Sequence, residues 1–143
     1  RAVRPGRSAA ARRPIVVDGS NVMYWRDNTP RLDSVKAVVD RLSALGYAPG
    51  VVFDANAGHL LAGRYLHDRE FGRRLGLPTE RVMVVPKGMP ADPVILHAAR
   101  SVGARIVTND RYRDWAEAHP EVHEPGRLIG GGYRSGDLRL ELD

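Results

Sequence analysis

Short apolar runs recur along the chain, and each ends at or near a polar residue. Residues 14–17 are Pro-Ile-Val-Val and lead to Asp18, and residues 51–53 are Val-Val-Phe and lead to Asp54. Neither run alternates with polar residues, which is typical of strands buried on both faces of a parallel sheet. The pattern therefore predicts a strand at each run. Two further strands are expected at residues 82–85 and 105–108.

Apolar residues at helical spacing separate these runs. Between Asp33 and Gly46 they recur every three or four positions, which predicts a helix capped by Asp33 or Ser34 and stopped by Gly46. A second helix is expected to start at Asp92 as its cap, because Pro93 suits a first helical turn. The remaining helices are expected at about residues 60–75 and 111–119.

The C-terminal region has a different pattern. Residues 127–130 and 138–142 predict a hairpin that turns through Gly130-Gly131-Gly132 or through Ser135-Gly136. Upstream of it, strands alternate with helices, which predicts a parallel α/β sheet with helices on both faces. We expect one three-layer α/β/α, Rossmann-like domain over residues 14–143, with a central, mainly parallel sheet and a C-terminal hairpin.

The positive charge of the chain lies at its N-terminus. The net charge is +5, and the first 13 residues hold five arginines and no acid, so acids and bases balance in the rest. Residues 1–13 are therefore expected to be a basic, disordered arm. Such an arm can follow a phosphate backbone, or it can be a linker from a longer protein.

Composition excludes several classes of protein. There is no cysteine, which excludes disulfides, thiol nucleophiles, iron–sulfur clusters and zinc sites built on cysteine. No phosphate-binding Gly-x-x-x-x-Gly-Lys-Ser/Thr loop is present. No apolar run approaches the ~18 residues of a membrane span, and no segment has the pattern of a signal peptide. We expect a cytoplasmic protein that does not contact membranes.

Polar residues gather where the expected strands end. The carboxyl ends of parallel strands form one edge of the sheet, where ligands bind, so these residues are expected to lie together. Asn21 is among them, close behind the first strand. Asp110 and Asp114 are four residues apart, so on the expected helix they would share a face. The acids expected at this edge are Asp18, Asp54, Asp92, Asp110 and Asp114.

Carboxylates packed together repel one another unless a cation neutralises them. Mg²⁺ and Mn²⁺ prefer oxygen ligands, and such an ion can activate water and shield the charge that develops on a phosphodiester. The acids as a set therefore favour metal-dependent phosphodiester hydrolysis. Taken singly, each aspartate is explained as well by a helix cap or a turn.

Four segments resemble one known family. Residues 15–22 (IVVDGSNV) resemble the opening motif of NYN domains, the PIN-like nuclease group that includes Regnase. Residues 91–96 (ADPVIL) are similar to its middle motif, and residues 106–114 (IVTNDRYRD) to its second long signature. Residues 127–129, which lead to the last apolar stretch, are similar to the closing strands of Regnase-type domains. The order is that of the family, and the likeness is to a minimal, bacterial version.

The resemblance implies a PIN-like fold and an endoribonuclease that cleaves single-stranded RNA with Mg²⁺ or Mn²⁺. It makes Asp18 the central metal ligand and Asn21 its polar neighbour, and both are catalytic residues. It also implies that Asn21, Thr108 and Asn109 contact the substrate in the cleft. The other acids that it implies as catalytic residues and metal ligands are Asp92, Asp110 and Asp114.

Contacts to RNA are expected beside these motifs. Arg111 and Arg113 follow closely after Asp110 in the sequence and can hold a phosphate. Trp25 can stack on an unpaired base with Arg26 beside it, although packing explains an aromatic residue there equally well. The arginine-rich stretch at residues 64–74 is more typical of a solvated helix face. Domains of this group often pair, so a homodimer is a further expectation.

Three other functions remain open at this point. An RNA-binding module with weak catalysis is supported by Ala91, which stands where the family often has a second acid. A phosphatase of another α/β fold would use Asp18 as nucleophile, but it would usually carry an aspartate in place of Ser20. The last alternative is a partner-binding domain that the N-terminal arm tethers to RNA or DNA.

Overall fold

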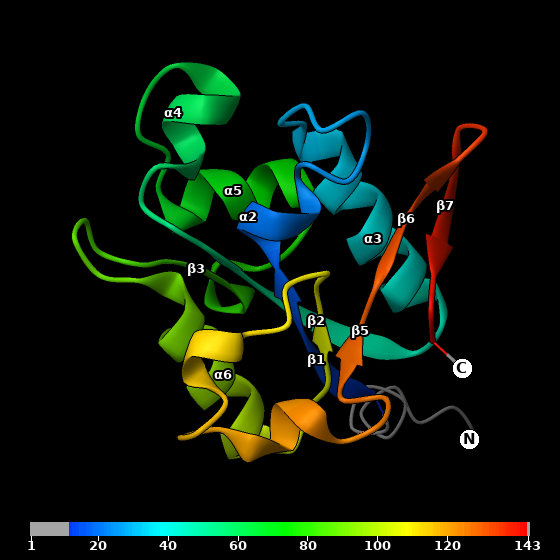
Figure 1. The fold of residues 1–143 in the computed structure, drawn as a ribbon. Helices are drawn as coiled ribbons and strands as arrows, with labels where there is room; N and C mark the ends of the chain where they lie inside the picture. Colours follow the sequence, from blue (N-terminus) through cyan, green and yellow to red (C-terminus); the bar gives the residue numbers. More distant parts are fainter. Residues whose placement is uncertain (1–11, 143) are drawn as a thin grey trace, which may run out of the picture.

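A five-stranded parallel sheet forms the centre of the computed structural model, which describes residues 12–142 (Figure 1). The strand order is β3-β2-β1-β4-β5, and every neighbouring pair is parallel. The predicted parallel sheet is confirmed, with one more strand than expected. Its strands are β1 (Arg13–Asp18), β2 (Tyr47–Phe53), β3 (Val82–Val84), β4 (Ile106–Val107) and β5 (Leu128–Ile129).

Helices cover both faces of this sheet, as the alternation of elements predicts (Figure 1). Helices α3 and α5 pack on one face and α6 on the other. The α-helices are α2 (Gly19–Val22), α3 (Leu32–Ala44), α4 (Ala57–Ala62), α5 (Asp68–Leu75) and α6 (Ala91–Val102). Three short 3₁₀ turns are η1 (Thr79–Arg81), η2 (Arg113–Trp115) and η3 (Pro120–His123).

The central position of β1 in the sheet explains why its sequence does not alternate between apolar and polar residues. Ile15 and Val17 belong to the core under α3 and α5, and Val16 belongs to the core under α6. Because both faces are covered, the run is apolar throughout, and all its residues after the exposed Pro14 are buried. The first polar residue after the run, Asp18, emerges at the edge of the sheet.

Two helix starts differ from the predictions. Helix α3 begins after Arg31 without a side-chain cap, and Asp33 lies inside its first turn. Helix α6 begins after Pro90, so Asp92 is also a first-turn residue and not the cap. Aspartate is favoured both as a cap and in the first turn, where it interacts with the positive end of the helix dipole. The sequence therefore does not distinguish these two positions for Asp33 and Asp92.

The helix expected at residues 60–75 is wrong in part, because two helices occupy the region. Helix α4 ends at Gly63, whose φ of +74° is left-handed, and α5 starts only at Asp68. The arginines of this region form a solvated face around Glu70, as expected. Arg64 and Arg74 each lie 2.8 Å from its carboxylate, which lowers the pKa of Glu70 to about 2.

The helix expected at residues 111–119 is wrong. After β4 the chain makes a tight turn in which the Tyr112 N–H donates to Asp110 Oδ1 at 2.7 Å. This local side-chain bond competes with helix formation. Tyr112 has a φ of +52°, and only the short turns η2 and η3 follow.

The C-terminal hairpin is present, but it begins later than predicted. β5 belongs to the parallel sheet, and the hairpin pairs β6 (Gly131–Arg134) with β7 (Asp137–Leu140). Its turn is the second of the two predicted sites, Ser135-Gly136. Both residues have positive φ, +52° and +82°, which suits a tight two-residue hairpin turn.

The predicted basic arm lies mostly outside the described residues. Its last two residues, Arg12 and Arg13, contact the folded body. The Arg12 guanidinium donates to the carbonyls of Ser43 and Tyr47 at 3.1 Å, and Arg13 lies over the Tyr47 ring. Within residues 12–142, no helix has the length and apolar character that crossing a membrane requires.

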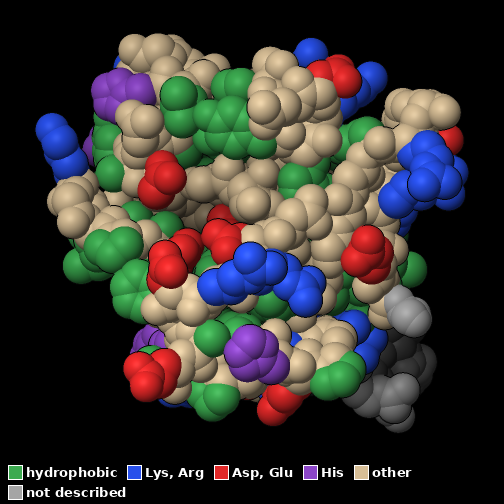
Figure 2. Space-filling model, viewed as in Figure 1, with side chains coloured by type: hydrophobic (Ala, Val, Ile, Leu, Met, Phe, Trp, Pro, Cys, Tyr) green, Lys and Arg blue, Asp and Glu red, His purple; other side chains and the backbone are tan. Residues whose placement is uncertain are grey.

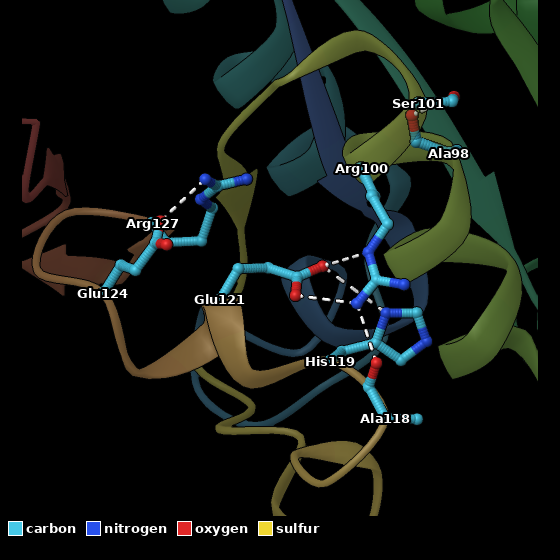
Figure 3. Close-up of polar contacts among 8 residues, drawn as sticks. All are labelled: Ala98, Arg100, Ser101, Ala118, His119, Glu121, Glu124 and Arg127. Carbon is cyan, nitrogen blue, oxygen red and sulfur yellow. Dashed lines mark hydrogen bonds and ion pairs between the residues drawn. The ribbon is translucent and has the colours of Figure 1, made fainter.

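An ion pair ties α6 to the segment that returns to the sheet (Figure 3). The Arg100 guanidinium donates to both oxygens of Glu121 at 2.8 Å and to the Ala118 carbonyl at 2.7 Å. These donors lower the pKa of Glu121 to about 2. The bidentate pair fixes the 3₁₀ segment against α6.

Replacing this guanidinium has a modest expected effect on stability. Arg100→Ala should lower the free energy of unfolding slightly at pH 7, since the pair is partly exposed and screened by solvent. Because the pKa of Glu121 is depressed in the folded state, the pair stabilises fully above the ordinary pKa near 4.5. Its contribution is lost as pH falls toward 2.

Urea unfolding of Arg100→Ala and wild type at pH 7 and pH 3 measures the difference. Lys36→Ala, which breaks the exposed Lys36–Asp40 pair on α3, is the matched control and should change little. A difference in the free energy of unfolding between Arg100→Ala and wild type that is as large at pH 3 as at pH 7 would contradict this role.

Candidate active site

The buried carboxylate of Asp18 is at the centre of the candidate site. It ends β1, between β2 and β4, where a parallel sheet of this order forms a crevice. Asp18 is only 4% exposed. Three donors point at it: the Tyr112 hydroxyl at 2.7 Å, the Thr108 hydroxyl at 3.1 Å and the Asn21 N–H at 3.2 Å.

Burial dominates the electrostatics of this carboxylate. It raises the pKa of Asp18 from 3.8 to about 6, against the lowering effect of the three donors. The nearby carboxylate of Asp92 raises the pKa further. Asp18 is therefore held in an environment that penalises its negative charge, and a cation at this place would relieve that penalty.

A second group of acids lines an open cleft beside Asp18. The cleft has a volume of about 390 Å³, and Asp92, Asp110 and Asp114 lie in its wall. Burial raises the pKa of Asp92, and Asp110, Asp114 and Asp54 raise it further. The charges of Asp54, Asp110 and Asp114 thus act on Asp92, as expected of acids that lie near one another. Figure 2 shows acidic side chains around the hollow of this face, with basic side chains next to them.

These acids have no basic partner in the described structure. Every ion pair between residues 12 and 142 uses another carboxylate, namely Asp40, Glu70, Glu121 or Glu124. Carboxylates that no ion pair neutralises attract cations.

Asn21 and Asn109 connect the edge of the sheet to the hairpin. The Asn21 side-chain oxygen accepts hydrogen bonds from Trp25 Nε1 and from the Asn109 N–H, both at 2.9 Å. The Asn109 side chain in turn bonds both the N–H and the carbonyl of Gly131. Both amides, predicted to contact substrate, are occupied by protein groups that hold the loops of the site together.

A family model described as the Zc3h12a-like ribonuclease NYN domain matches residues 11–127. The chain belongs to this family. It is therefore a ribonuclease domain, and the resemblance of its motifs to NYN domains is confirmed. Nucleases of this class generally depend on a divalent metal ion.

Two solved structures share the fold of this NYN domain. The first is the nuclear proteinaceous RNase P 2 (PRORP2) of Arabidopsis thaliana, and the second is the nuclear protein-only RNase P 2 (PRORP2) of the same plant. The first has a TM-score of 0.70 at 18% sequence identity, and the match covers 99% of this chain and 33% of the PRORP2 chain. The other has a TM-score of 0.68 at 21% identity, with 89% and 29% covered. The NYN domain therefore spans about a third of these proteins, and the likeness is one of fold.

The donor set at the site suits a hydrated divalent ion. Between residues 12 and 142, no three acids or histidines come close enough to hold one ion directly. Mg²⁺ usually keeps several of its waters and binds through one or two carboxylates, so the arrangement fits an ion held partly through water. The donors are all hard oxygens, which also suit Mn²⁺.

The residues predicted to bind RNA lie in two places. Arg111 and Arg113 are exposed and line the same cleft as Asp110 and Asp114. Trp25 and Arg26 lie against the hairpin instead. The Trp25 ring occupies the space that a side chain at Gly131 would need, and the Arg26 guanidinium lies 5.5 Å from the centre of the Tyr133 ring.

Tyr112 is the functional residue that the sequence analysis missed. It is 1% exposed, and its hydroxyl makes the shortest contact to Asp18. Burial and the Asp18 charge raise the pKa of Tyr112 above its usual range, so the hydroxyl stays protonated and donates. The sequence pattern predicted that this tyrosine lies on a regular helix. No pattern in the sequence indicates the left-handed backbone conformation of Tyr112 that directs its hydroxyl to Asp18.

Proposed function

We propose that this domain is an endoribonuclease that cuts single-stranded RNA by attack of water, with Mg²⁺ or Mn²⁺ at its aspartates. The observation that carries the proposal is the buried Asp18 carboxylate beside a set of acids without basic partners among the described residues. That arrangement costs stability, and it suits a site that works with a bound cation.

Each residue of the site has a separate task in this proposal. Asp18 would bind the ion, and Asp92, Asp110 and Asp114 would hold it or its waters, with Asp54 as a further acid. The bound ion would activate the attacking water and shield the charge that develops on the phosphodiester. Tyr112 and Thr108 position Asp18 by donating to it.

The RNA would enter from the open side of the cleft. Arg111 and Arg113 can hold phosphates there, because guanidinium groups make charge-assisted bonds to phosphate oxygens. Asp18 is recessed, so the scissile phosphate must reach inward, which a flexible single strand does more easily than a stiff duplex.

Loss of either arginine should weaken binding of RNA and leave the chemistry intact. Arg111→Ala and Arg113→Ala are each expected to raise KM about fivefold and to reduce its salt dependence. Arg69→Ala is the matched control, since it removes an exposed arginine on α5, outside the cleft. Steady-state kinetics at several salt concentrations measures both effects, and an unchanged KM in both cleft variants would contradict the role.

Cleavage of an end-labelled, unstructured RNA tests the activity itself. The RNA and a DNA of matching sequence are incubated with Mn²⁺, with Mg²⁺ and with EDTA. We expect RNA to be cut internally with either metal and DNA to resist. Cleavage that continues in EDTA would contradict the use of a metal ion.

A second function is an RNA-binding module with weak catalysis. Ala91 favours it, because the family often has an acid there, and α6 starts with this residue at the site. Binding of RNA without cleavage in any metal would support it over the nuclease. We also propose a cytoplasmic location, and the predicted homodimer can be tested by light scattering.

A further inference from the structure

A second and larger hollow lies at the other end of the same sheet edge. Its volume is about 790 Å³, against about 390 Å³ for the cleft beside β4. It is lined by the residues that follow β2, by α4 with Tyr65 after it, and by the loop that leads into α6. Asp54 forms part of its wall, and the same Asp54 raises the pKa of Asp92. Pro90 lines this hollow and Asp92, two residues later at the start of α6, lines the cleft, so the two hollows are neighbours.

One wall of this hollow is fixed by close packing of the backbone. Gly58 of α4 lies so near residues 64–66 that a Cβ there would overlap the N–H of Leu66. The Leu66 side chain is fully buried. These contacts hold Tyr65 beside α4 while its side chain remains 40% exposed.

The opposite wall is a tight turn. The Met89 N–H donates to the Pro86 carbonyl at 3.0 Å, and Gly88 between them has a φ of +86°. That conformation suits a type II turn, which needs glycine at its third position. The turn presents Met89, which is 48% exposed, and an exposed Lys87.

The lining combines the groups that an unpaired nucleotide requires. Tyr65 and Met89 offer apolar surface, and an aromatic face stacks on any base. Asn56 and His59 add polar groups that can bond to the edge of a base. Lys87 supplies a positive charge, and no carboxylate pairs with it among residues 12–142.

We propose that this hollow is a nucleotide subsite of the nuclease. One unpaired base that flanks the scissile phosphate packs against Tyr65 and Met89, and Lys87 holds a neighbouring phosphate. The strand would then run from Arg111 and Arg113 across the acids into this hollow. The inference rests on the proposed function. It adds a subsite that binds one base to the site at which the phosphodiester is cleaved.

Kinetics with matched variants tests the subsite. Tyr65→Ala and Met89→Ala should each raise KM about tenfold with kcat nearly unchanged, since stacking acts on binding. Met83→Ala is the control for Met89→Ala, because Met83 is equally exposed (49%) but lies on β3 away from the hollow. Lys36→Ala is the control for Lys87→Ala, because Lys36 is also exposed but lies on α3 and does not line the hollow.

An RNA with one missing base identifies the nucleotide that is held. Removing the base at the flanking position should raise KM for wild type and have little further effect in Tyr65→Ala. If base removal raises KM as much in Tyr65→Ala as in wild type at every flanking position, the subsite is overturned, because Tyr65 and the base then do not interact.

Photo-crosslinking separates this inference from the proposed activity. RNA carrying 5-iodouridine is irradiated with the Asp18→Asn protein in EDTA, where no cleavage is required, and the adduct is mapped by mass spectrometry. We expect adducts at Tyr65 or Met89. If wild type cuts no RNA in any metal, the proposed activity fails while adducts there still support the subsite. Adducts confined to other residues would overturn the subsite even if cleavage is normal.

Discussion

Asp18→Asn is expected to lower RNA cleavage by about a thousandfold or more, because it removes the charge that would bind the metal ion. Asparagine has the same shape, and its oxygen can still accept from Tyr112 and Thr108. The protein should therefore stay folded. Cleavage by the variant at the wild-type rate would contradict the role of Asp18.

The same variant should gain stability at neutral pH. The pKa of Asp18 is about 6 in the folded state and 3.8 ordinarily, so its ionisation penalises the folded state by about 3 kcal/mol above pH 6. Losing the bond from the Asn21 N–H offsets about 1 kcal/mol of the gain. We expect a net gain of about 2 kcal/mol at pH 8.

Urea unfolding across pH measures this gain. Because the folded-state pKa is raised, the penalty grows as pH rises from about 4 through 6, and the gain should disappear below pH 4. Asp40→Asn, on the exposed face of α3, is the control and should show no such gain. A variant less stable than wild type at pH 8 would contradict the argument from burial.

Tyr112→Phe is expected to have the second largest effect. It removes the 2.7 Å hydrogen bond to Asp18, so the pKa of that carboxyl rises above its present value of about 6. The free energy of unfolding should fall by about 2 kcal/mol at pH 8, the usual worth of a bond to a charged group. The loss should be smaller at pH 4, where the carboxyl is protonated in both proteins.

The pH dependence of cleavage distinguishes positioning from packing. If cleavage needs the ionised Asp18, the acidic limb of the profile moves to higher pH in Tyr112→Phe, and activity falls about tenfold at pH 6. Tyr133→Phe on the hairpin is the matched control and should leave the profile in place. A wild-type profile in Tyr112→Phe would contradict a direct link between this hydroxyl and Asp18.

The strands of the sheet could be predicted because strands buried on both faces have uninterrupted apolar runs in the sequence. The run that ends at Asp18 and the run that ends at Asp54 are apolar at every position, and both proved to be central strands. The end of α3 close to Gly46 was equally clear, since Gly46 has the positive φ that favours glycine. These features depend on local sequence alone.

Other features depend on contacts between distant residues, and the sequence does not reveal them. Asp110 and Asp114 reach one cleft, but through a tight turn and not the shared helix face that their spacing predicts. The sequence left open whether Trp25 stacks on a base or packs in the protein, and a hairpin more than a hundred residues later packs against it. Tyr112 acts on Asp18 across 94 positions of the chain.

The source of the oxygen in the cleaved RNA tests the central claim most directly. A short RNA is cut with Mn²⁺ in ¹⁸O-labelled water, and the new ends are analysed by mass spectrometry. Attack by water predicts one ¹⁸O in a terminal phosphate on one product and a free hydroxyl on the other, with no reaction by Asp18→Asn. A 2′,3′-cyclic phosphate without ¹⁸O would contradict the account, because it would show attack by the 2′-hydroxyl of the RNA.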